Sequence, residues 1–79
     1  MRQKEMTPGD AAFLAYMDRT KRRYGLTTLT LADSWGIAHG TVDNWRSDPG
    51  RIKLRDLRRL VRDHGMTAED VLRILEVEE

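Results

Sequence analysis

The stretch from residue 28 to residue 47, TLTLADSWGIAHGTVDNWRS, constrains the fold of this chain more than any other. Its apolar residues recur at helical spacing in two short runs, residues 31–35 and 42–45, with a glycine between them. Gly36 can adopt the positive φ that a tight corner between two helices requires. We therefore predict two short helices joined by a turn, the second held from behind by Ile37, Val42 and Trp45.

The opposite face of the second helix carries small and polar residues, which we expect to face solvent. They are Ala38, His39, Gly40, Thr41, Asp43, Asn44 and Ser47. A short helix that is fixed from behind is suited to presenting its other face to a partner.

This segment resembles the helix-turn-helix of the Cro and phage-repressor family, also called the xenobiotic-response-element type. The resemblance rests on Ala32, the glycine four residues later, the aliphatic residue after it and the apolar pair three apart in the second helix. It extends over residues 13–75. Lys21 and Gly25 match a basic residue and a closing glycine of the family's first helix, and IKLRDLRRLVRDHGM with TAEDVL resembles its last two helices. The resemblance implies a lambda-repressor-like fold whose second motif helix enters the DNA major groove by its N-terminal end.

The whole chain predicts an all-α fold, because three further amphipathic segments and no strand pattern surround the central stretch. A length of 79 residues has room for one domain. We predict a flexible N-terminal tail at residues 1–7 and a single compact five-helix bundle at residues 8–79. The helices are expected at about residues 8–24, 28–35, 39–46 and 54–64 and from residue 68 onward. Threonines are expected to cap the first, second and fifth of them, and glycines to follow the first, second and fourth.

Apolar spacing also predicts which residues of the outer helices form the core. In the first helix these are Phe13, Met17, Thr20 and Tyr24; in the fourth they are Leu57, Leu60, Val61 and His64. The arginines of the fourth helix, Arg55, Arg58, Arg59 and Arg62, are expected to face outward.

The net charge is only +1, but the charges are unevenly distributed. Residues 19–62 hold eleven lysines and arginines against four aspartates, whereas residues 66–79 hold one arginine against five acids. This uneven distribution favours a cationic binding surface and an anionic surface at the C-terminal part of the chain. An ordinary solvated surface whose charges happen to cluster would show the same distribution.

Composition argues against several other classes of protein. There is no cysteine, and the two histidines are too few and too far apart in sequence for a metal site, so we expect no cofactor. No nucleophile, base and orienting group occur together, which argues against an enzyme. No membrane span, signal peptide or small-molecule site is evident, and we expect a cytoplasmic protein.

The resemblance implies that bases are read by the turn and the first two turns of the second motif helix. The expected base contacts are Ala38, His39, Gly40, Asp43 and Asn44. Asn44 is the best candidate because its amide offers adenine a donor and an acceptor together. Asp43 has two possible roles. Its carboxylate accepts a hydrogen bond from a cytosine amino group, or it pairs with Arg46 and contacts no base. The alternative for Asn44 and His39 is that they are ordinary surface residues without a role in binding.

Phosphate contacts are expected on both sides of this helix. The residues are Lys21, Thr28, Thr41, Arg46, Ser47, Arg51, Lys53 and Arg55. Thr41 has two alternatives, a cap on its own helix or a contact with a thymine methyl group. The chain departs from the family pattern at Arg46, where many members carry an acid that pairs with the first-helix base, so Lys21 and Arg46 cannot form that ion pair.

We predict a sequence-specific regulator that binds double-stranded DNA, most simply a repressor or Cro-like regulator of a phage or mobile element. A single module reads few base pairs, so a homodimer on a palindromic operator is expected. Its interface is predicted at Met66, Val71, Leu72 and Leu75, unless Val71, Leu72 and Leu75 complete the monomer core. The alternatives are a helical adaptor that binds protein, a phage packaging component with little sequence preference and an antitoxin.

Overall fold

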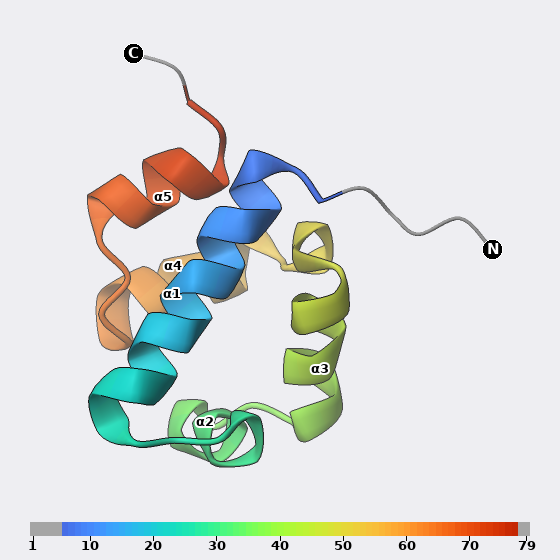
Figure 1. Cartoon of the computed structure of the whole chain (residues 1–79), viewed down its shortest axis with the longest axis vertical. Coiled ribbons are helices and arrows are strands. Elements are labelled where there is room, and N and C mark those ends of the chain that lie inside the picture. Colours follow the sequence, from blue (N-terminus) through green and yellow to red (C-terminus); the bar gives the residue numbers. More distant parts are fainter. Residues whose placement is uncertain (1–5, 78–79) are drawn as a thin grey trace, which may run out of the picture.

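The computed structural model describes residues 6–77, which form an all-α bundle without strands. The five helices are α1 (Pro8–Tyr24), α2 (Thr28–Trp35), α3 (His39–Ser47), α4 (Leu54–Asp63) and α5 (Ala68–Ile74), and a 3₁₀ turn, η1 (Pro49–Arg51), precedes α4. In Figure 1, α1 crosses the middle of the molecule in front of α4, with α5 on one side, α3 on the other and α2 below. The predicted five-helix fold is thus confirmed. Most of the predicted tail, residues 1–5, lies outside the described residues.

Side-chain caps and glycines define the helix ends as the sequence predicts. Threonines begin α1, α2 and α5, and each forms a reciprocal capping box with the residue three positions later: Thr7 with Asp10, Thr27 with Thr30, and Thr67 with Asp70. Helices α1 and α2 both end at a left-handed glycine, with φ values of 64° and 67°. Of the helices within residues 6–77, none has the length and apolar character needed to cross a membrane.

Two aromatic pairs attach α2 and α3 to α1. The ring of Tyr16 stacks on that of Trp35, with centroids 5.9 Å apart and planes 14° apart. The ring of Phe13 meets Trp45 edge-on, at 6.2 Å and 83°. All four side chains are buried, and each pair is worth about 1 kcal/mol beyond the apolar area it buries. Helix α1 therefore fixes the position of both shorter helices.

Helix α5 is attached to α1 through a buried carboxylate. Asp70 accepts a hydrogen bond of 2.5 Å from the Arg19 guanidinium and another of 3.0 Å from the backbone N–H of Thr67. Burial alone would raise the pKa of Asp70, but these hydrogen bonds outweigh it and hold that pKa below its ordinary value of 3.8. The Asp70 carboxylate thus stays charged at neutral pH, and its ion pair with Arg19 links α5 to α1.

Three predicted orientations are wrong. Tyr24 is 64% exposed at the end of α1, where it lines an open hollow beside Ser34 and Trp35; the inward position belongs to Tyr16, which the prediction missed. Val61 is exposed on the side of α4 toward α5, since Leu57 and Leu60 already fill the inward stripe of this short helix. Arg59 is partly buried, because its guanidinium hydrogen-bonds to the backbone of α2.

Candidate nucleic-acid interface

A tight turn sets the position of α3 relative to α2. The N–H of Gly36 donates to the carbonyl oxygen of Asp33 at 3.1 Å, and the N–H of Ile37 donates to that of Ala32 at 3.0 Å. These two bonds form a Schellman motif, and the positive φ of Gly36 makes it possible. Since Ala32 is fully buried, α2 approaches its neighbours closely at this point.

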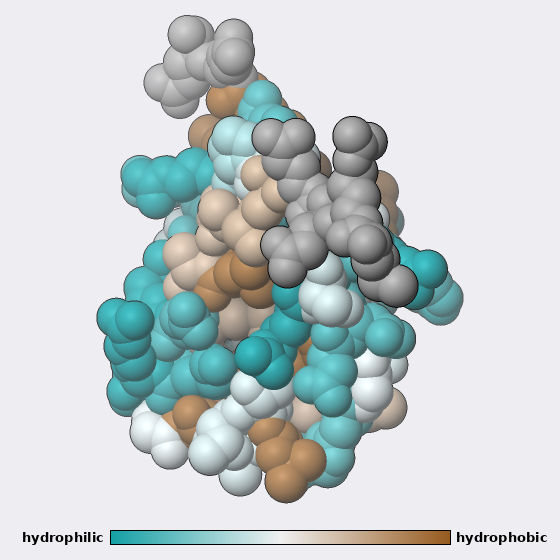
Figure 2. All heavy atoms as spheres, turned by 45° about the vertical axis from the view of Figure 1, so that its right-hand side comes forward, coloured by the Kyte–Doolittle hydropathy of each residue, from teal (hydrophilic) through white to brown (hydrophobic). Residues whose placement is uncertain are grey.

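The back and the front of α3 differ as predicted. Val42 and Trp45 are buried on the back. All five predicted base contacts, Ala38, His39, Gly40, Asp43 and Asn44, are exposed. Figure 2 brings forward the side that carries α3 in Figure 1, and hydrophilic teal and white spheres cover most of its lower half, with separate brown spots. A polar face on a rigid support is therefore available to a ligand, while contact with DNA stays a prediction.

The start of α3 carries no side-chain cap. Its N-cap residue is Ala38, which has an extended backbone and no side-chain hydrogen bond to the helix. The alternative that Thr41 caps α3 is therefore wrong: the N–H of Thr41 donates to the carbonyl oxygen of Ala38 at 3.0 Å as part of the helix itself. The first N–H groups of α3 thus point out of the helix end, at the positive pole of its dipole.

A hydrogen bond across the turn orients His39. Its Nε2 lies 2.8 Å from Oδ1 of Asp33 in the last turn of α2, and the His39 side chain is 48% exposed. In the neutral ring that donates through Nε2, Nδ1 is left as an acceptor. Asp33 was not among the predicted site residues. An acid three residues before the turn glycine, with a histidine three residues after it, is the sequence signal for this pairing.

A polar hollow of about 440 Å³ lies between α3, η1 and the start of α4. Four predicted DNA contacts from these elements line it: Thr41, Asn44, Arg51 and Lys53. Arg51 also forms an ion pair of 3.6 Å with Asp48, although its own side chain is 71% exposed. The structure therefore brings the best predicted base reader next to two predicted phosphate contacts. Arg55, exposed in the first turn of α4, lies outside this lining.

The remaining predicted phosphate contacts form two further groups. At the start of α2, Lys21 donates a 3.3 Å hydrogen bond to the Thr28 hydroxyl and pairs with Asp18 at 3.4 Å. At the end of α3, Arg46 lies 3.9 Å from Asp43, which agrees with the second possible role of Asp43. The Ser47 hydroxyl donates back to carbonyl oxygens within α3.

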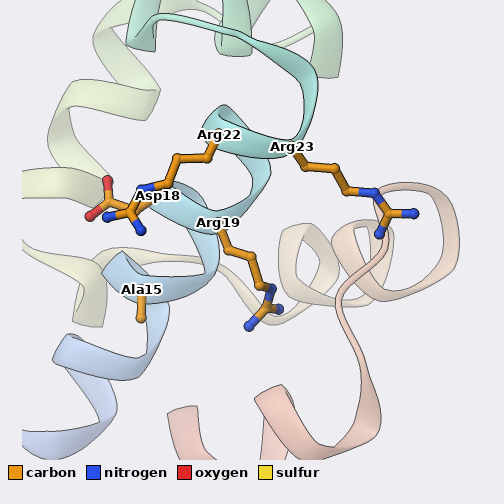
Figure 3. Close-up of a pocket in the computed structure, with 5 residues that line it drawn as sticks. All are labelled: Ala15, Asp18, Arg19, Arg22 and Arg23. Atoms are coloured by element: carbon orange, nitrogen blue, oxygen red, sulfur yellow. The ribbon is translucent and has the colours of Figure 1, made fainter.

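The arginines at the end of α1 do not form a second cationic site. A shallow hollow is lined by Ala15, Asp18, Arg19, Arg22 and Arg23, all from α1. Figure 3 shows the three guanidinium groups spread away from one another, and two of them are engaged: Arg19 with Asp70 and Arg23 over the ring of Tyr24. Such an arrangement does not converge on one anion.

The predicted dimer residues fall into two groups. Met66 is only 3% exposed and belongs to the core, so its assignment to a dimer surface was wrong: the turn after α4 folds it inward. Val71 packs partly against the core, whereas Leu72 and Leu75 are exposed. The alternative that Val71, Leu72 and Leu75 all complete the monomer core is therefore wrong as well.

No protein-family model, no curated protein and no solved structure matches this chain.

Proposed function

We propose that the protein binds double-stranded DNA and reads its sequence with the exposed face of α3. The observation that carries this proposal is the position of Asn44. It is exposed on a helix whose back is buried, and it shares a hollow with the cationic side chains of Arg51 and Lys53. Base readout requires a polar side chain held at a fixed depth, and phosphate contacts beside it supply most of the affinity.

The N-terminal half of α3 is the part that enters the major groove in this proposal. The groove is wide enough for one α-helix. Gly40 has no neighbour within 4 Å of the position a Cβ would take, so it leaves space for the close approach of a base or sugar. His39, held by Asp33, presents Nδ1 to an amino group of adenine or cytosine, and Asn44 contacts adenine.

Phosphates on the two sides of the groove are contacted by different elements. Arg51 and Lys53 contact the backbone beyond α3. On the other side, Thr28 and Leu29 belong to the first turn of α2, where N–H groups lack acceptors within the helix, and Lys21 lies beside them. Two flanking contacts set the depth and direction of α3 in the groove.

The biological role that fits this mechanism best is a transcriptional regulator, most simply a repressor or Cro-like protein of a phage or mobile element. The resemblance of residues 13–75 to that family supports the role. Two copies on a palindromic operator give the specificity that one short helix lacks.

Selection of bound duplexes from a random pool tests the proposal. We expect an enriched sequence of two inverted half-sites about one helical turn apart. Binding without enrichment would favour the packaging alternative, and absence of duplex binding at low salt would favour the protein adaptor.

A further inference from the structure

An open groove between α4 and α5 is lined by aliphatic side chains and two arginines. Its volume is about 460 Å³. No residue of α2 or α3 contributes to the lining, so the groove is a different surface from the candidate nucleic-acid interface. Contiguous exposed apolar surface of this kind is typical of a site that binds a partner. Four large hydrophobic residues of the lining remain 40–58% exposed: Leu54, Val61, Leu72 and Leu75.

The two charged residues of the lining are both cations on α4. Arg58 and Arg62 are four residues apart and therefore lie on the same side of the helix. Within residues 6–77, Arg58 forms no ion pair. Arg62 pairs at 3.3 Å with its sequence neighbour Asp63, and both of these side chains are exposed. Because an exposed pair of this kind contributes little, both arginines are available to an acidic partner.

We propose that the groove binds an amphipathic helix of another protein, with acidic residues beside its apolar ridge. Helix α4 has ten residues and is about 15 Å long, so a partner helix of about three turns spans the groove. The partner's apolar residues at i, i+3, i+4 and i+7 fill the space between the two helices. Its acids pair with Arg58 and Arg62, whose spacing of four residues matches two acids one turn apart.

The acids of α5 make a second copy of this chain a poorer occupant. An α5 helix from another copy would supply the apolar ridge of Leu72 and Leu75, but it brings no unengaged carboxylate to Arg58. The three acids of residues 69–76 are already engaged within their own chain: Glu69 with Arg73, Asp70 with Arg19, and Glu76 with the N–H of Gly9. A separate acidic helix supplies the missing charge.

This inference goes beyond the proposed DNA binding and does not rest on it. The lining of the groove shares no residue with the polar hollow beside α3. One chain therefore has separate surfaces for a duplex and for a protein helix.

Two synthetic peptides test the charge of the occupant. Both are amphipathic helices of about four turns with leucine at i, i+3, i+4 and i+7, and they carry either glutamate or lysine beside the leucines. Fluorescence anisotropy with the full chain should give the glutamate peptide a Kd on the order of 100 μM and the lysine peptide a Kd severalfold weaker. Equal binding of the two peptides, or no binding of the glutamate peptide up to about 1 mM, would overturn the proposal.

Variants of the chain test where the peptide binds. Leu72→Arg places a charge in the groove and should abolish binding, with unchanged helical circular dichroism. Its matched control, Leu29→Arg, alters an exposed leucine of α2 and should bind as the wild type does. Arg58→Glu should make the lysine peptide the tighter ligand, whereas Arg22→Glu changes the net charge equally on α1 and should not. Equal effects of a variant and its control would contradict the proposed site.

Sedimentation equilibrium of the chain without peptide tests the rival occupant. The wild type and Leu72→Arg should have the same mass, because the groove is open when the partner is absent. A wild-type mass of about 18 kDa, twice 9.2 kDa, that falls to 9.2 kDa in Leu72→Arg would overturn the proposal. A second copy would then be the occupant of the groove.

Discussion

The guanidinium of Arg59 in α4 donates a 2.7 Å hydrogen bond to the carbonyl oxygen of Trp35, the last residue of α2. This carbonyl belongs to the end of a helix, where no N–H within the helix reaches it. The same guanidinium lies 3.2 Å from the position a Cβ on Gly36 would occupy. One side chain thus links α4 to the turn that orients α3.

Replacing Arg59 should therefore loosen the turn. Arg59→Ala removes a charged hydrogen bond to a partly buried carbonyl, and we expect the free energy of unfolding to fall by about 1.5–3 kcal/mol. Urea unfolding measures this change. Arg55→Ala, an exposed arginine on the same helix, should change stability by less than about 0.5 kcal/mol. Equal effects would mean that the Arg59 bond contributes nothing.

Gly40→Ala should move stability and DNA binding in opposite directions. A Cβ at Gly40 meets no atom within 4 Å, and alanine is the better helix former, so the free energy of unfolding should rise by up to about 1 kcal/mol. If α3 enters the groove at Gly40, the added methyl group lies against DNA and affinity falls. Thermal unfolding and fluorescence anisotropy measure the two effects, and a variant that is more stable and binds equally well would place Gly40 outside the contact.

The hydrogen bond between Asp33 and His39 predicts coupled effects on sequence preference. Asp33→Ala removes a negative charge near DNA together with the acceptor that holds His39, so binding to random duplexes should strengthen or stay the same. Freed from Asp33, His39 should discriminate less among bases, and the ratio of specific to random affinity should fall severalfold. His39→Ala should lower the same ratio. In the double variant the two losses of specificity should not add, because both act through one contact. Additive losses would mean that Asp33 and His39 act independently of each other.

His64 predicts a loss of stability in mild acid. Its ring tilts against Trp35, with centroids 5.8 Å apart, and its Nε2 is buried without a hydrogen-bond partner in the described part of the chain. Burial and then the nearby Arg59 charge lower the pKa of His64 from its ordinary value of 6.5, although Asp63 opposes this shift. As the pH falls below 6.5, the unfolded chain takes up a proton more readily than the folded one, so stability decreases.

Urea unfolding at pH 7.5 and 5.5 measures this dependence. The wild-type chain should be less stable at pH 5.5, and His64→Phe, which keeps an aromatic ring against Trp35, should lose part of the difference. His39→Ala removes the other histidine and should retain it. A pH dependence that disappears with His39 rather than His64 would reverse this assignment.

Local features of the fold were predictable from sequence, because they depend on residues a few positions apart. Threonine caps, the glycine at each end of the α2 segment and the inward direction of both tryptophans all follow from short spacings. The inward stripe of α1 was not predictable in full. Tyr16 and Tyr24 lie within the same broad apolar sector, and the position of Trp35, on which Tyr16 stacks, decides which of the two is buried.

Features of the candidate site that depend on contacts between distant segments were also missed, because short sequence spacings do not show which segments meet. Arg59 is 24 residues from its acceptor on Trp35, and nothing in the α4 pattern distinguishes it from its exposed neighbours. The pairing of Asp33 with His39 needs the turn geometry of Gly36. The exposure of Leu72 and Leu75 depends on how much of α5 the core covers, which apolar spacing alone does not give.

The measurement that tests the central proposal most directly compares Asn44→Ala and Arg51→Ala on two duplexes, the selected site and a random sequence, over a range of salt concentrations. Asn44→Ala should lose about 1–3 kcal/mol on the selected site and little on the random one. Arg51→Ala should weaken binding to both and reduce the salt slope by about 1. Equal losses for Asn44→Ala on both duplexes would contradict the assignment of α3 as the helix that reads sequence.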